Sequence, residues 1–187
     1  MNRVFPVTCF LLFFCLLSTT MQAQSPEHEL GIRLANLQDF GVVYKRKKSE
    51  NKYLRLTLAI AEFRFQSREG SDNDVFSTSL NLGVGIEKRK AINQKLQFIH
   101  GFDPALGIGL TTVLDDFQLR LTPSLGYILG FQLNLADNFY INLETRPRLI
   151  VSVPIDNTGV QENITVDLGL NSNVVFFSFV YQFDWEK

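Results

Sequence analysis

A period-two alternation of apolar and polar residues runs through almost all of the chain after residue 29, and it constrains the fold more than any other feature. In segment 117–133 the odd positions are apolar at nearly every step, and the even positions are mostly polar or glycine. Segments 75–87 and 139–153 repeat the pattern. Because successive side chains of a β-strand point to opposite faces, this periodicity predicts strands with one apolar and one polar face.

Breaks rich in turn-forming residues separate the alternating segments. Outside the N-terminus no segment follows the helical period. The pattern therefore predicts an all-β chain of eight strands, at about 29–37, 40–47, 52–65, 75–88, 95–113, 117–134, 139–155 and 164–183.

Two of these strands change phase, after Ile60 and after Leu170, which predicts a bulge or, in the last strand, a turn at 171–173. That turn, together with another at Asp103-Pro104, would give ten strands instead. We favour eight because the apolar phase of strand 95–113 runs through Pro104 without a slip.

The N-terminus predicts a cleavable signal peptide at residues 1–23, followed by one barrel domain at 24–187. Arg3 precedes a short apolar core, and Ala23 supplies the small residue that signal peptidase requires. The core is short for a membrane anchor, which is the alternative. Cys9 and Cys15 both lie in this segment, so the mature chain has no disulfide and no thiol chemistry.

The distribution of charge indicates that the apolar face points outward. The apolar faces carry almost no charge, and the eight lysines lie at predicted strand ends, in turns or at the terminus, at positions 45, 47, 48, 52, 88, 90, 95 and 187. A charged side chain facing the middle of a bilayer would cost about 2–4 kcal/mol. We therefore predict a closed antiparallel up-and-down transmembrane β-barrel of eight strands, with a secreted, soluble, lipocalin-like ligand-binding barrel as the alternative.

The polar face carries charges of both signs among small residues. Eight strands enclose a space just wide enough to be filled by side chains, and opposite charges there would neutralise one another. We interpret the set as a structural plug, and a binding or gating network is the alternative. The predicted lumen charge network comprises Arg33, Arg55, Asp103, Arg120, Glu144, Arg146, Arg148 and Asp167.

The last strand alternates aromatic residues at the end of the chain, at Phe177, Phe179, Tyr181 and Phe183. This strand resembles the terminal strand of small bacterial outer-membrane β-barrel proteins, the porin-like superfamily, although four further residues follow it. The resemblance implies that these aromatics are the signal read by the barrel assembly machinery. It also implies a Gram-negative outer-membrane location, with both termini in the periplasm and outer-membrane lipid as the surroundings.

No catalytic or cofactor-binding motif emerges from the sequence. Only two histidines are present, His28 and His100, so neither a zinc cluster nor an acid–base constellation can be assembled. The balance of 18 basic and 19 acidic residues argues against nucleic-acid binding. We predict a monomeric, non-enzymatic protein without metal or cofactor and with a structural or surface-interaction role. The alternative is a carrier or narrow pore for a small apolar molecule.

Overall fold

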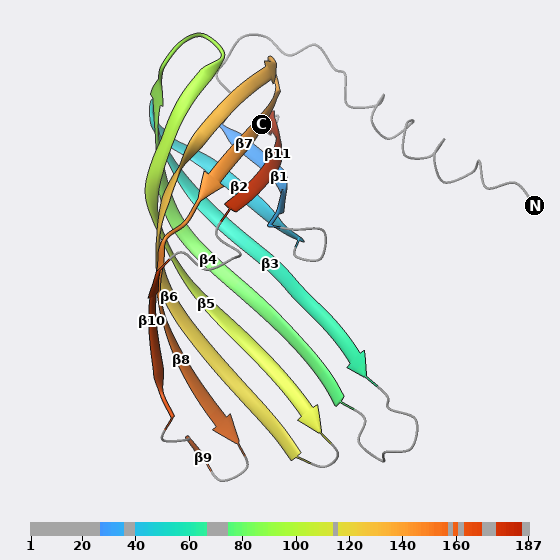
Figure 1. Cartoon of the computed structure of the whole chain (residues 1–187). Helices are drawn as coiled ribbons and strands as arrows, with labels where there is room; N and C mark the ends of the chain where they lie inside the picture. The colour runs from blue at the N-terminus through green and yellow to red at the C-terminus, as the bar shows by residue number, and fades with distance from the viewer. Residues whose placement is uncertain are drawn as a thin grey trace, which may run out of the picture.

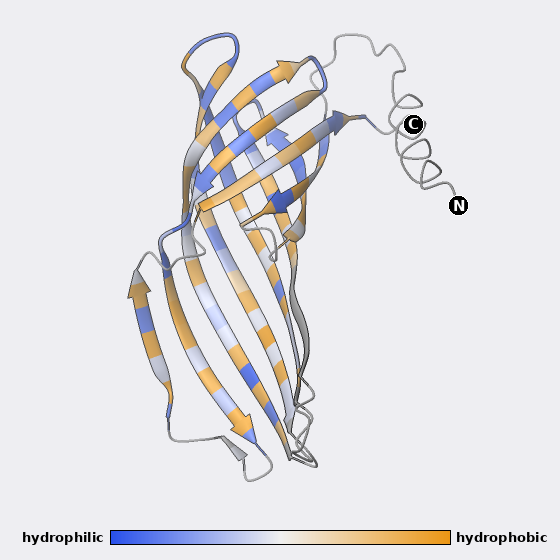
Figure 2. Ribbon diagram, turned by 45° about the vertical axis from the view of Figure 1, so that its right-hand side comes forward, coloured by the Kyte–Doolittle hydropathy of each residue, from blue (hydrophilic) through white to orange (hydrophobic). Residues whose placement is uncertain are grey.

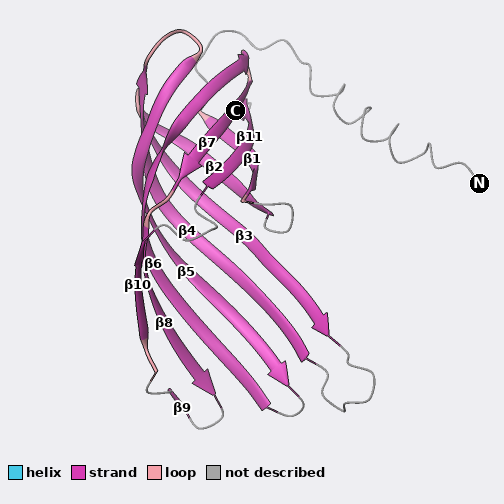
Figure 3. Ribbon diagram, viewed as in Figure 1, coloured by secondary structure: helices cyan, strands magenta, loops and turns pink. Residues whose placement is uncertain are grey.

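The computed structural model describes residues 27–35, 40–66, 75–113, 116–156, 159–160, 163–169 and 175–184. Within these residues all regular secondary structure is β-strand (Figures 1 and 3). None of the described segments is a helix long and apolar enough to cross a membrane. The predicted signal peptide lies outside the described residues.

The described strands form one antiparallel sheet. Their bounds are β1 His28–Leu34, β2 Phe40–Ser49, β3 Lys52–Gln66, β4 Val75–Ala91, β5 Leu96–Val113, β6 Asp116–Ala136, β7 Phe139–Thr145, β8 Arg148–Asp156, β9 Gly159–Val160, β10 Thr165–Gly169 and β11 Val175–Phe183.

Eight of these strands close into a ring, which confirms the predicted eight-stranded antiparallel barrel. Strands β1 to β7 pair in chain order, β11 pairs with β7, and β1 pairs with β11 to close the ring. The turns 50–51, 92–95 and 137–138 lie at the same end of the ring as His28 and Phe183, the first residue of β1 and the last of β11 (Figure 1).

Beyond the other end of the ring the sheet continues but does not close. β2 begins at Phe40, which is paired with Ile60, so from Ala61 onward β3 pairs with β4 alone among the described strands. On the other side, β8 pairs with β6, and β10 pairs with β8 alone among the strands that the structure describes. We call this part the outer sheet: the far halves of β3 to β6 together with β8 and β10, with β9 attached to β8 (Figure 1).

Two predicted strands, 139–155 and 164–183, need correction. In the structure each of them is divided into two strands. Arg146 and Pro147 separate β7 from β8, and Pro147 has no N–H with which to continue a ladder. After this break the chain stays beside β6 but exchanges β11 for β10 as its other neighbour. The phase change predicted after Leu170 and the alternative turn at 171–173 lie outside the described residues; β10 before them belongs to the outer sheet, and β11 after them belongs to the ring.

Other predicted details are confirmed at the level of the backbone. The register of β3 against β4 shifts between Ala61 and Phe63, where the sequence changes phase. β5 runs through Asp103 and Pro104 without a turn, so the turn that would have divided this strand does not form. Pro104 still pairs with Leu125 on β6, whereas the ladder toward β4 is interrupted there because proline has no N–H to donate.

The barrel is polar inside and apolar outside, since charged side chains are buried and large hydrophobic ones are exposed. Figure 2 shows the alternation of hydrophobic and hydrophilic residues along the strands. The exposed fractions of Ile32, Phe102 and Leu143 are 58%, 58% and 54%, although all three are large hydrophobic residues. The inner face holds most of the buried charge, together with a small apolar cluster of Val43, Tyr140 and Val180.

Candidate functional site

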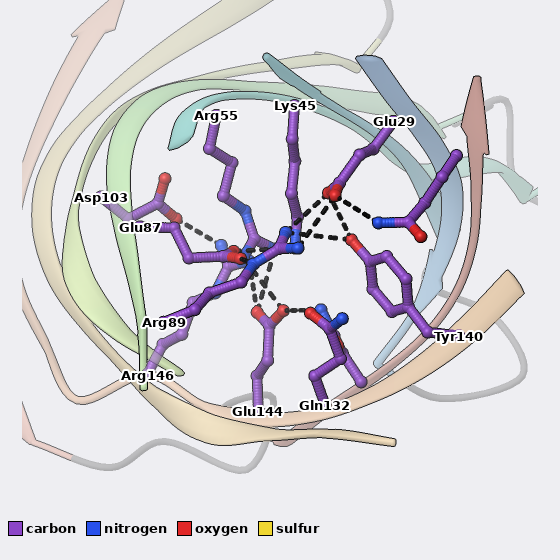
Figure 4. A network of polar contacts seen from close by, with 12 residues as sticks. Glu29, Lys45, Arg55, Glu87, Arg89, Asp103, Gln132, Tyr140, Glu144 and Arg146 are labelled. Atoms are coloured by element: carbon purple, nitrogen blue, oxygen red, sulfur yellow. Dashed lines mark hydrogen bonds and ion pairs between the residues drawn. The ribbon is translucent and has the colours of Figure 1, made fainter. Parts of the chain in front are cut away.

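The ring encloses a continuous network of buried charges, which we call the lumen network (Figure 4). It comprises Glu29, Lys45, Arg55, Glu87, Arg89, Asp103, Tyr140, Asn142, Glu144, Arg146 and Arg148. Strands β1 to β5 and β7 supply charged or polar side chains to it, and Gln182 of β11 donates a hydrogen bond to Glu29. Strand β6 borders the network through the buried Gln132.

At the turn end the network is centred on Arg89. Its two terminal nitrogens donate to the two carboxylate oxygens of Glu29, at 2.8 and 2.6 Å, and its Nε donates to Glu87 at 2.8 Å. Tyr140 donates to Glu29 at 2.5 Å, and Gln182 donates to the same carboxylate at 2.9 Å. The Arg89 guanidinium also lies 3.6 Å from the centre of the Tyr53 ring. Such bidentate, charge-assisted bonds fix the side chains in one geometry.

In the middle of the ring, Arg55 joins two carboxylates. It lies 3.0 Å from Glu87 and 2.9 Å from Glu144, and all three side chains are fully buried. Lys45 approaches the other side of Glu87 at 2.7 Å. Glu87 therefore has two basic partners here, and Glu144 has Arg55 and also Arg146. These pairings offset the high cost of removing the charges from water.

At the end nearest the outer sheet, Arg146 pairs with Asp103 and with Glu144, the second at 3.0 Å. Arg148 lies 4.0 Å from Asp103. Arg33 is also buried here, with its guanidinium 4.3 Å from the centre of the Phe176 ring. Ionic contacts thus run through the interior from the turn end to the end nearest the outer sheet.

The structure brings together six of the eight predicted lumen residues. Arg33, Arg55, Asp103, Glu144 and Arg146 are buried inside the ring, and Arg148 lies at its outer end. Two predictions of position are wrong. Arg120 and Asp167 point to the same face of the sheet as the lumen residues, but they lie on the outer sheet and are exposed, because the wall does not close around them.

Four charged members of the lumen network were missed: Glu29, Lys45, Glu87 and Arg89. The lysine distribution places Lys45 at a strand end or in a turn, but β2 extends past Lys45 and β4 past Arg89, and both side chains point inward. The argument from lysine position is wrong for Lys45, although Lys48, Lys52, Lys88, Lys90 and Lys95 are exposed. Residue parity was the available signal, since Glu87 and Arg89 continue the inward phase of Gly83 and Gly85.

The aromatic residues predicted as an assembly signal all lie on the outer face of β11. Phe179 is 42% exposed and lies between Phe177 and Phe139, with ring centroids 4.8 and 6.2 Å away. Phe183 stacks on His28 of β1, which in turn hydrogen-bonds Tyr44 at 2.7 Å. The contact between Phe183 and His28 joins β11 to β1, the two strands whose pairing closes the ring. The role as an assembly signal stays a prediction.

The concave face of the outer sheet holds a separate cavity of about 320 Å³. Hydroxyl and amide side chains predominate in its lining, and Arg120 is its one charged residue. The lining comprises Ser77, Thr78, Ser79, Leu80, Asn81, Gly107, Ile108, Gly109, Thr111, Gln118, Arg120 and Thr122. Among the residues with described positions, no group of three His, Cys, Asp or Glu side chains is arranged to hold a metal ion.

Comparison with known proteins gives a structural likeness but no family. No family model matches the chain, and no curated protein sequence matches it. The chain is similar to the crystal structure of Ail, the attachment invasion locus protein of Yersinia pestis. The identity is 14%, the match covers 82% of this chain and 90% of that chain, and the TM-score is 0.43. The barrel assignment therefore rests on the strand pairing itself.

Proposed function

We propose that the chain is an integral outer-membrane barrel whose filled ring anchors the outer sheet at the cell surface. The observation that carries the proposal is the inversion of polarity: Lys45, Arg55 and Glu87 are fully buried while large apolar side chains cover the outside. In water this arrangement is unfavourable on both faces, whereas in a bilayer the apolar exterior contacts lipid. The same observation argues against the soluble lipocalin-like alternative.

Strand length supports a protruding outer sheet. β4, β5 and β6 have 17, 18 and 21 residues, whereas a strand needs about 9–11 residues to cross a membrane. The ring lies at the end with the short turns, and the family resemblance puts such turns in the periplasm. The remaining length of these strands would then stand at the outer surface.

The outer sheet suits a surface-interaction role. Over its length β10 pairs with β8 alone among the described strands, so its other edge presents unpaired backbone groups. Val166 and Leu168 on this strand are 64% and 82% exposed. A free edge with exposed apolar side chains can accept an extended strand from a protein partner.

The proposed role is neither catalysis nor transport of an apolar molecule. His28 and His100 lie on the outer face and contact Tyr44 and Tyr127, away from the lumen network. The lumen network fills the ring, and the cavity of the outer sheet is lined mainly by polar groups, which do not match a small apolar molecule.

Cell fractionation and a detergent gel test the proposal. The full chain should be recovered with the outer membrane, and the unheated protein should migrate differently from the boiled protein, because a closed barrel resists the detergent. Reconstituted in planar bilayers, it should show no stepwise conductance, since ionic contacts fill the ring. Recovery as a soluble periplasmic protein with no heat shift would contradict the membrane location, and steady ion conduction would contradict the filled ring.

A further inference from the structure

Three arginine side chains meet at one phenylalanine where the ring gives way to the outer sheet. The guanidinium carbons of Arg33, Arg146 and Arg148 lie 4.3, 4.8 and 5.8 Å from the centre of the Phe176 ring. Arg33 comes from β1, Arg146 and Arg148 flank the β7–β8 break, and Phe176 belongs to β11. We call Arg33, Arg146 and Arg148 the arginine cluster.

Carboxylates do not balance the charge of the arginine cluster. Arg146 pairs with Asp103 and Glu144, but Glu144 is shared with Arg55. Arg148 lies 4.0 Å from Asp103, and Arg33 forms no ion pair with any described residue. Within the described ring, five buried basic side chains face four buried acidic ones, and Arg148 adds a sixth cation at the outer end.

The same arginines have unused hydrogen-bond donors. Nη1 of Arg33 and the Nε atoms of Arg146 and Arg148 are buried and have no acceptor among the described residues. The Phe176 ring attracts the guanidinium groups but carries no net charge, so it offsets only part of their repulsion. Buried cations with unpaired donors are costly, and this cost would be relieved by an anion with several acceptor oxygens.

We propose that the arginine cluster binds an oxyanion of phosphate or sulfate chemistry, reached along the concave face of the outer sheet. Guanidinium groups present paired N–H donors that match the oxygens of such anions. An anion can reach the arginine cluster at Arg148, because 16% of this side chain is exposed and it points to the concave face. Farther out, the same face carries the hydroxyl and amide groups of the cavity, which suit a hydrated ligand. The site stands apart from the proposed anchoring role.

Calorimetric titration of the mature chain tests the site. The protein is kept in octyl glucoside micelles, which contain no phosphate, and is titrated with inorganic phosphate against sodium chloride at equal ionic strength. We expect saturable phosphate binding, and Arg33→Gln should weaken it at least about tenfold because a charged donor is lost. Arg120→Gln is the matched control, since it removes the same charge from the exposed part of the same face, and its affinity should be unchanged.

Thermal unfolding gives a second readout, in which Arg33→Gln is expected not to weaken the protein although it weakens phosphate binding. Phosphate should raise the Tm of the unmodified protein more than chloride does, because a ligand of the folded state stabilises it. Without phosphate, Arg33→Gln should be at least as stable as the unmodified protein, since it removes an unpaired buried cation. If Arg33→Gln does not fold, Arg148→Gln at the half-open position provides the same comparison.

The source of the oxyanion is distinguished by a third arm. Short-chain phosphatidylglycerol added to the micelles should displace inorganic phosphate if a lipid headgroup occupies the site, and should leave the titration unchanged if the ligand is a dissolved phosphate. Absence of phosphate binding, or equal losses in Arg33→Gln and Arg120→Gln, would overturn the proposal.

Discussion

At the scale of single residues, Arg55 is the side chain on which the lumen network depends most. It neutralises Glu87 and Glu144 at the centre of the ring, where all three side chains are fully buried. Arg55→Met should destabilise the barrel by about 3–5 kcal/mol, because it leaves buried carboxylates with fewer cations. Urea unfolding of the protein refolded in vesicles measures this loss. Arg120→Gln removes an exposed arginine and should change the free energy of unfolding little; equal effects of the two changes would contradict a structural plug.

Gly85 is a second residue-scale constraint, because two strands approach each other closely there. A Cβ at this position would lie 2.6 Å from the carbonyl oxygen of Phe102 and 2.9 Å from Oδ1 of Asp103. Gly85→Ala should therefore destabilise the ring by about 1–3 kcal/mol, as crowding of a packed interior does.

The matched control for this change is Gly109→Ala on the outer sheet. A Cβ at Gly109 has its nearest neighbour, Cβ of Arg120, at 3.8 Å, so the methyl group fits without displacement. The same urea titration should show no comparable loss. If Gly85→Ala were as stable as Gly109→Ala, close approach would not be the reason for glycine at this position.

At the scale of elements, the alternation of apolar and polar residues predicts the strands of the barrel. It does not predict how far along these strands the barrel is closed. The alternating position of a residue along its strand places Arg55 and Glu144 on the polar face. The same rule places Arg120 and Asp167 on that face equally well. What separates these pairs is the length of the neighbouring strands, since β1 ends at Leu34 and β2 begins at Phe40. Strand pairing is a non-local property that a pattern within one segment does not contain.

The same limit explains Lys45 and Arg89. Lys45 is followed by Arg46, Lys47 and Lys48, and Arg89 lies between Lys88 and Lys90. Such charged runs are usually solvated, which favours a turn. Lys45 on β2 pairs with Glu87 of β4, and Arg89 on β4 pairs with Glu29 of β1. Only the closeness in space of these acids from other strands makes the inward orientation favourable. The sequence therefore predicts the two faces of each strand, whereas the partners across the lumen become evident only in the closed ring.

At the scale of the whole molecule, the ring and the outer sheet place different demands on the surroundings. Inside the ring every strand has two neighbours, whereas the outer sheet ends in the free edges of β3 and β10 among the described strands. Unpaired backbone groups are costly in hydrocarbon but can be hydrated in water. The lowest cost is therefore reached when the bilayer surrounds the ring and the edges stand outside it.

This placement predicts a preference for thin bilayers. The seven residues of β7 give the closed ring a height of about 18 Å, at roughly 3.3 Å per residue and a strand tilt near 40°. The apolar band of typical outer-membrane barrels is about 25 Å tall. Refolding should therefore be more complete in vesicles with 10- or 12-carbon acyl chains than with 16-carbon chains, since thicker bilayers would bury the free edges or be locally thinned. The heat-shifted gel band measures the folded fraction at one temperature above the melting point of every lipid used. Equal or better folding in the thick bilayer would place the outer sheet within the membrane.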